Sequence, residues 1–243
     1  MRRPPLWSRL WTDFRERGLA YVIGSRTAGL RVRAGAGFAQ LTRGRRTFTL
    51  GGRAYRYFYH HHNVTWRNER SVEVPWAWEV VQASRGPILE VGNVLSWYFD
   101  FAHDVIDKYE TGPGIRNVDV VEFETPTRYA LIVSISTLEH VGFDEPLKAP
   151  DKPRQAVLRL RRLLAPSGKL LVSMPLGWNP AVDAWVLEKA PEFDSLRFLK
   201  RVSQANDWRE IDAAEARGAR YGHPFSHGNV IALGVVLAED PAR

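Results

Sequence analysis

The stretch Ile88-Leu89-Glu90-Val91-Gly92-Asn93-Val94-Leu95-Ser96 decides the fold class. The breaker pair Gly86-Pro87 precedes it, and the apolar run that follows is typical of a short strand buried inside a parallel sheet. The glycine that ends this run allows the backbone to turn tightly beside a ligand. In open α/β sheets, ligands bind beyond the carboxyl ends of the strands, so residue 92 is predicted to lie at a binding edge.

Strands and helices alternate on the C-terminal side of this stretch. Apolar runs predict further strands within 103–107, around Val105-Ile106, and at 118–121, 129–136, 169–174 and 229–238. A helix is predicted over 153–164, because Pro153 suits a first helical turn and the apolar residues that follow form one stripe. This alternation predicts an α/β fold with helices on both faces of the sheet.

The N-terminal part has a different composition. Residues 1–58 contain 13 Arg, no Lys, and only Asp13 and Glu16 as acids, which gives them a charge of +11 within a chain of net charge +7. The sequence pattern predicts an amphipathic helix over residues 1–18. It also predicts a hairpin formed by Phe48–Leu50 and Tyr55–Tyr59, and a helix from about Asn68 to Ser84. We therefore divide the chain into a basic N-terminal extension, 1–62, and a main domain, 63–243.

Composition excludes several classes of protein. The chain has no cysteine, which removes disulfides, thiolate metal sites and cysteine nucleophiles. No run approaches the ~18 apolar residues of a membrane span, and we predict a cytoplasmic protein without membrane contact.

The basic extension could contact nucleic acid, although a solvated extension is the interpretation we favour. A homodimer formed through this extension is a further prediction.

Acids follow three successive predicted strands at Glu90, Asp107 and Asp119. An acid at the second strand end can accept hydrogen bonds from both ribose hydroxyls of a nucleoside, and one at the third could accept from an adenine amino group. A dinucleotide would require Gly-x-Gly-x-x-Gly at the first turn, whereas this turn has only Gly92. The carboxylate at 90 disfavours a diphosphate and suits a cationic amino-acid group, which favours S-adenosylmethionine (SAM).

These residues resemble a known family. Residues 88–92 resemble motif I of the class I SAM-dependent methyltransferases. Residues 119–123 resemble the adenine-contact segment of this family, and residues 129–133 resemble its fourth strand. The sequence Leu138-Glu139-His140-Val141 resembles the one that follows this strand in the family. The resemblance extends through 160–174 and implies a Rossmann-like, seven-stranded, mostly parallel sheet. The second and third glycines of motif I are replaced by Asn93 and Leu95, so this turn is degenerate.

The resemblance implies a set of cofactor-binding residues and SAM as cofactor, with S-adenosylhomocysteine (SAH) as product. Glu90 would bind the methionine amino group, Asp107 the ribose and Asp119 the adenine. The complete predicted set is Glu90, Gly92, Asn93, Asp107, Lys108, Asp119, Val120 and Ser136.

Histidines and tryptophans are the candidates for catalysis and acceptor binding. His140 follows the fourth strand at the cofactor edge, where it is either a general base or a side chain that closes the cofactor pocket. The predicted acceptor residues are Trp76, His223 and His227. Three consecutive histidines, 60–62, cannot all face one way in a strand, and we predict no metal site.

From these residues we predict O-methylation of a small molecule, such as a natural-product or sugar hydroxyl. Two alternatives stay open. One is a SAM- or nucleoside-binding protein without turnover, suggested by the degenerate turn. The other is an RNA methyltransferase that uses the basic N-terminus, although the chain lacks an Asn-Pro-Pro-Tyr-like motif and a catalytic cysteine. Nucleic acid is therefore a less favoured partner than a small-molecule acceptor.

Overall fold

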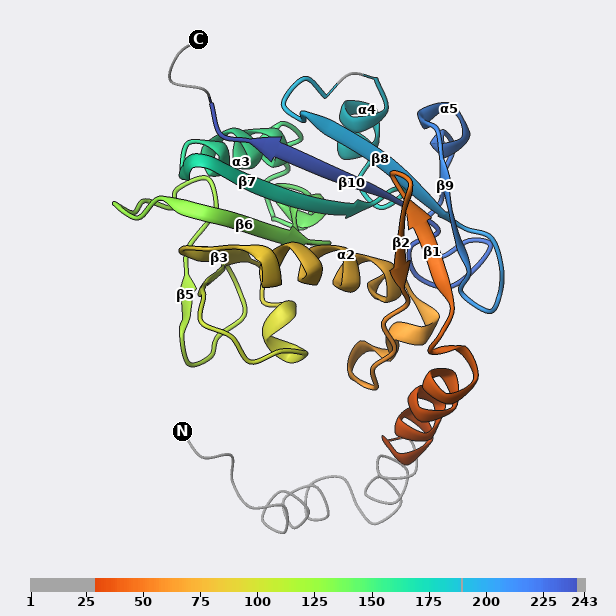
Figure 1. The fold of residues 1–243 in the computed structure, drawn as a ribbon. Coiled ribbons are helices and arrows are strands. Elements are labelled where there is room, and N and C mark those ends of the chain that lie inside the picture. The colour runs from red at the N-terminus through yellow and green to blue at the C-terminus, as the bar shows by residue number, and fades with distance from the viewer. Residues whose placement is uncertain (1–28, 189, 240–243) are drawn as a thin grey trace, which may run out of the picture.

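The structure is a computed structural model that describes residues 29–188 and 190–239. Its centre is a sheet with strand order β5-β4-β3-β6-β7-β10-β8-β9 (Figure 1). In this sheet β3 to β7 run parallel, and β10 is antiparallel to both of its neighbours. The strands are β3 (Ile88–Val91), β4 (Asp104–Asp107), β5 (Ile115–Asn117), β6 (Tyr129–Ile135), β7 (Leu164–Pro175), β8 (Ser195–Arg201), β9 (Trp208–Ile211) and β10 (Val230–Leu237).

Helices cover both faces of the sheet, as predicted. In β6, Leu131, Val133 and Ile135 lie in the same apolar cluster as α2 (Arg70–Ala83), whereas Ile132 lies with α3 (Lys152–Arg161) and α4 (Pro180–Glu188). This division follows from strand geometry, since successive side chains point to opposite faces. The remaining helical elements are η1 (His62–Arg67), η2 (Leu95–Trp97), η3 (Leu138–His140) and α5 (Ala213–Ala216).

The predicted Rossmann-like α/β class is confirmed, with differences in detail. The sheet has 8 strands rather than seven, because β9 pairs with β8 as an extra edge strand. The strand predicted at 118–121 is wrong. The chain turns there instead, since the Asp119 side chain accepts a hydrogen bond from the Val121 amide and its carbonyl accepts one from the Glu122 amide. The third strand, β5, ends before this turn.

The predicted helix at 1–18 lies outside the described residues. Residues 29–43 are helical, which the sequence pattern did not predict. The predicted hairpin is confirmed as β1 (Thr47–Leu50) and β2 (Arg53–Arg56), joined by a turn with positive φ at Gly51 and Gly52. Its Phe48 and Leu50 are buried in the same cluster as α2, and β1 contacts β9. The division of the chain at residue 62 stays a prediction.

Candidate functional site

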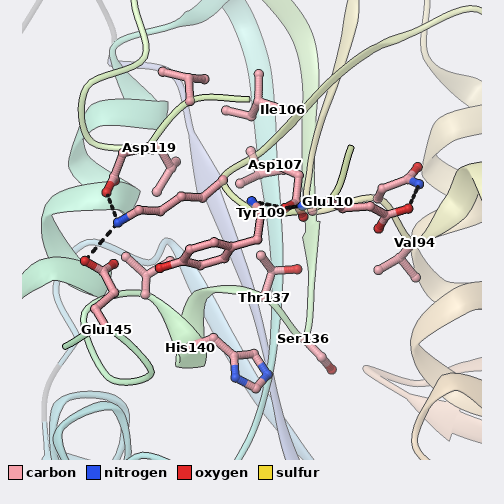
Figure 2. A pocket seen from close by; sticks show the side chains of 17 residues that line it. Val94, Ile106, Asp107, Tyr109, Glu110, Asp119, Ser136, Thr137, His140 and Glu145 are labelled. Carbon is pink, nitrogen blue, oxygen red and sulfur yellow. Dashed lines mark hydrogen bonds and ion pairs between the residues drawn. The ribbon is translucent and has the colours of Figure 1, made fainter. Parts of the chain in front are cut away.

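A cavity of about 370 Å³ lies at the carboxyl ends of the parallel strands β3, β4 and β6, and we call it the first cavity. Every predicted cofactor residue except Glu90 lines it, and so does His140. These residues come from separate segments, and the sheet brings them together because parallel strands present their carboxyl ends at one edge (Figure 2).

Gly92 lines the first cavity at a point where the chain approaches Thr137 closely. Its φ is +82°, and a Cβ at this position would lie 2.2 Å from the Thr137 hydroxyl oxygen. Only glycine therefore fits here, both for its backbone conformation and for the close approach of the segment after β6. The predicted reason for this glycine, a tight turn at the binding edge, agrees with that geometry.

Asp107 organises the loop that borders the first cavity. Its Oδ1 accepts hydrogen bonds from the Tyr109 and Glu110 amides, at 2.8 and 2.7 Å. Among the described residues, its second carboxylate oxygen has no hydrogen-bond partner. The side-chain Nδ2 of Asn93 donates to the Glu110 carboxylate at 2.6 Å, which ties the loop after β3 to the loop after β4.

Four charged side chains form a network at one end of the first cavity. The Lys108 ammonium contacts Asp119 at 2.8 Å and Glu145 at 2.9 Å, and Lys152 contacts the same two carboxylates at 2.6 and 2.8 Å. Figure 2 shows Asp119 and Glu145 directed to one shared ammonium group. Burial would raise the pKa of both carboxyls, but hydrogen bonds from the lysines outweigh it, lowering the pKa of Asp119 and bringing that of Glu145 to about 2.

Glu90 does not line the first cavity. Its carboxylate is buried and accepts hydrogen bonds from the Val94 amide at 2.9 Å and the Leu95 amide at 2.5 Å. Its other oxygen lies 3.0 Å from His103 Nε2. In this structure Glu90 stabilises the loop after β3, and the predicted contact with a methionine amino group stays a prediction.

A second cavity, of about 140 Å³, adjoins the first, because Ser136 and His140 line both. The His140 ring lies 2.5 Å from an Asp144 oxygen through Nδ1 and 3.5 Å from a Glu139 oxygen through Nε2. Its ring also meets that of Trp178 edge-on, with centroids 5.3 Å apart. His140 thus lies between the two cavities with one nitrogen facing each carboxyl group.

The predicted acceptor residues are distributed over different places. His227 lines the second cavity. Trp76 belongs to α2, is buried in the core and lines neither cavity. His223 is exposed and also lines neither cavity. Of the three consecutive histidines, His62 stacks on Trp97 with centroids 4.4 Å apart. Across the described residues, no group of three or more acidic and histidine side chains is arranged to hold a metal ion.

Sequence reasoning missed several lining residues. Tyr109, Glu110, Thr137 and Glu145 line the first cavity, and Glu69, Arg70 and Glu139 line the second. Tyr109, Glu110, Thr137 and Glu139 lie within two residues of predicted site residues, and this proximity was the available signal. Glu69 and Arg70 carry no such signal, because they begin a helix that precedes the sheet.

Comparisons with known proteins give two results. No family model and no curated protein matches the sequence. Solved structures that are similar include the N-methyltransferase NodS from Bradyrhizobium japonicum in complex with SAH, at 12% identity and a TM-score of 0.45, over 71% of this chain and 88% of that chain. The sugar N-methyltransferase KedS8 from Streptoalloteichus sp. has 12% identity and a TM-score of 0.39, over 70% and 89% of the two chains. The CcbJ methyltransferase from Streptomyces caelestis has 11% identity and a TM-score of 0.36, over 68% and 88%.

Each helix in the described part of the chain is too short or too polar to cross a membrane.

Proposed function

We propose that this protein is a SAM-dependent methyltransferase that acts on a small-molecule acceptor. The observation that supports it most is the first cavity, where Gly92, Asp107 and Asp119 meet at the carboxyl edge of the sheet. Their order along the chain matches the order of methionine, ribose and adenine contacts that the resemblance implies.

The residues present fit this cofactor. A volume of about 370 Å³ is within the range of small-molecule sites, which starts near ~300 Å³. Ile106, Val120 and Val141 give the cavity an apolar wall against which an adenine ring could pack. The second oxygen of Asp107 is available for ribose hydroxyls, and the close approach at Gly92 keeps the backbone free of a side chain that would fill this edge.

The protein's part in the chemistry is positioning. SAM supplies an electrophilic methyl group on a sulfonium, which is already a good leaving group, so alignment of the acceptor supplies most of the remaining rate enhancement. The second cavity adjoins the first through Ser136 and His140 and is the place where an acceptor could meet the methyl group. The hydroxyl acceptor and the role of His140 as general base, both expected from the sequence, stay predictions.

Isothermal titration with SAH and with NAD tests the proposal. We expect saturable binding of SAH at one site per chain and weak or undetectable binding of NAD, because the turn after β3 lacks the glycines that admit a diphosphate. Preferential binding of NAD, or no binding of SAH, would overturn the proposal.

A further inference from the structure

The second cavity is bordered by an unusual group of buried ionisable side chains. Glu69, Glu73 and Glu139 are all buried, at 6%, 0% and 1% exposure, and they surround Arg70 closely enough to influence one another's ionisation. Three carboxyl groups thus lie near two guanidinium groups, that of Arg70 and, close to Glu69, that of Arg201. Buried charges are costly unless they are paired, so this group has room for one more positive charge.

Two of the three carboxyl groups have their hydrogen bonds satisfied by the protein. Glu73 accepts from the Ser136 hydroxyl and from Arg70, each at 2.7 Å. Glu69 accepts from the Gly228 amide at 3.0 Å. These contacts join α2 to the segments after β6 and before β10, and they fix the frame of the second cavity.

Glu139 is different, because His140 Nε2 lies 3.5 Å from its Oε1 but no donor from the described residues reaches its other carboxylate oxygen. Its Oε2 is buried and has no hydrogen-bond partner among the described residues. Its position is nevertheless fixed, since the Asn179 side chain donates to its backbone carbonyl at 2.9 Å. Burial raises the pKa of the Glu139 carboxyl well above its ordinary value, and the neighbouring Glu73 raises it further. A buried acceptor without a donor costs free energy that a bound ligand could recover.

The other walls of the second cavity also suit a cation. Trp178 and Tyr221 line it, with ring centroids 4.9 Å apart, and aromatic rings attract cations placed over their faces. Two further buried atoms of the lining residues have no partner among the described residues, His227 Nδ1 and Arg70 Nε. A carboxylate ligand would be repelled by the acidic group, and a hydroxyl would offer one donor but no charge. An ammonium offers both charge and several donors.

We propose that the second cavity binds the methyl acceptor through a primary or secondary amine, which the Glu139 carboxylate holds and deprotonates. This inference rests on the proposed methyltransferase function and names its substrate class. It assigns to Glu139, rather than to His140, the proton transfer that precedes methylation.

The amine enters as an ammonium, and one N–H bond breaks as its proton moves to the ionised Glu139 carboxylate, which leaves the electron pair on nitrogen. That pair forms the new N–C bond while the S–C bond breaks, and the sulfur keeps its electrons. The methylated ammonium then leaves, and the Glu139 proton is lost to solvent through the opening of the cavity.

Three small probes that differ in charge but little in shape test this inference: benzylamine, benzyl alcohol and benzoate. Each is titrated by isothermal calorimetry into the whole protein, with and without saturating SAH. We expect benzylamine to bind at least tenfold more tightly than benzyl alcohol, and benzoate to bind least tightly. Glu139→Gln should remove the preference for the amine and leave the affinity for the alcohol within twofold of wild type.

Glu192→Gln is the matched control, because Glu192 is also buried but pairs with Arg154 and Trp185 instead of lining the second cavity. It should retain the amine preference. Equal affinities of the wild-type protein for benzylamine and benzyl alcohol would overturn the inference. This test does not depend on whether any variant folds. An amine preference that survives in a folded, SAH-binding Glu139→Gln protein would do so as well. If the wild-type protein does not bind SAH, the methyltransferase proposal is overturned, and with it the role of the second cavity as the acceptor site.

Discussion

Gly92 and Thr137 approach so closely that a Cβ on Gly92 would lie 2.2 Å from the Thr137 hydroxyl oxygen and 2.9 Å from its methyl carbon. This contact joins the carboxyl ends of β3 and β6, which are neighbouring parallel strands. The floor of the first cavity is formed where they meet, so the shape of this cavity depends on the absence of one side chain.

Gly92→Ala is therefore expected to destabilise the protein and to distort the first cavity. Overpacking and a left-handed backbone conformation together should lower the free energy of unfolding by about 2–5 kcal/mol. Chemical denaturation measures this loss. Gly52→Ala is the matched control, because Gly52 has a φ of +79° and nothing within 4 Å of the added Cβ. If Gly92→Ala lowers the free energy of unfolding by no more than Gly52→Ala does, the steric argument is contradicted.

The second prediction concerns Asp107. In Asp107→Asn, the amide oxygen can still accept the hydrogen bonds of the Tyr109 and Glu110 amides, but the negative charge is lost. Because hydrogen bonds to charged groups contribute about 1.5–3 kcal/mol, SAH affinity should fall at least tenfold while the fold persists. Calorimetric titration with SAH measures the change. Asp212→Asn, which alters an exposed aspartate that accepts from the Glu215 amide, should leave SAH affinity unchanged.

Parts of this site were predictable from sequence because their signals are local. The strands β3 and β6 consist of apolar runs, and Gly92 and Asp107 lie directly at strand ends, so position along the chain placed them at the binding edge. In contrast, β5 is a three-residue strand, two of whose side chains are exposed, and it gives no apolar pattern to detect. The third strand was therefore predicted at 118–121, where the residues are more apolar but the chain forms a turn.

Other parts depend on contacts that no local pattern reveals. The orientation of Glu90 is set by the loop amides at 94 and 95 and by His103, directly before β4, and these partners meet only in the folded chain. Likewise Lys152, on α3, reaches Asp119 from 33 residues away. Strand ends fix where a carboxylate lies, whereas its partners depend on the packing of elements distant in sequence.

The third prediction follows from the lysine–carboxylate network. Since the folded-state pKa values of Asp119 and Glu145 are depressed, their contribution to stability is present above the ordinary carboxyl pKa and is lost as the pH falls. For Glu145 this window extends from its ordinary value of 4.5 down to about 2. Urea unfolding measured from pH 6 to pH 3 should show this loss. Lys152→Met should reduce the slope of the free energy of unfolding against pH in this window. Lys169→Met, at an exposed position, should not change this slope.

The last prediction concerns the pair of Glu90 and His103, whose side chains are 1% and 6% exposed. His103 Nδ1 faces the Phe101 carbonyl at 2.9 Å and so donates to it, while Nε2 faces the Glu90 carboxylate at 3.0 Å. Two acceptors at the two nitrogens favour the imidazolium. Burial opposes this charge, but the hydrogen bonds to Glu90 and to the Phe101 carbonyl, together with the negative charges of Glu90 and Asp104, outweigh it and raise the pKa of His103.

A raised histidine pKa stabilises the fold fully below the ordinary value of 6.5, and this contribution is lost as the pH rises through the folded-state value. The free energy of unfolding of the wild type should therefore decline as the pH rises above 6.5. In His103→Gln, the side-chain amide can still donate to Glu90 but cannot titrate, so stability should be lower at pH 6 and the decline should be smaller. Denaturation curves across this range measure both effects, with His223→Gln, at an exposed position, as the control. An identical pH dependence in wild type and His103→Gln would show that the imidazolium does not hold the loop after β3.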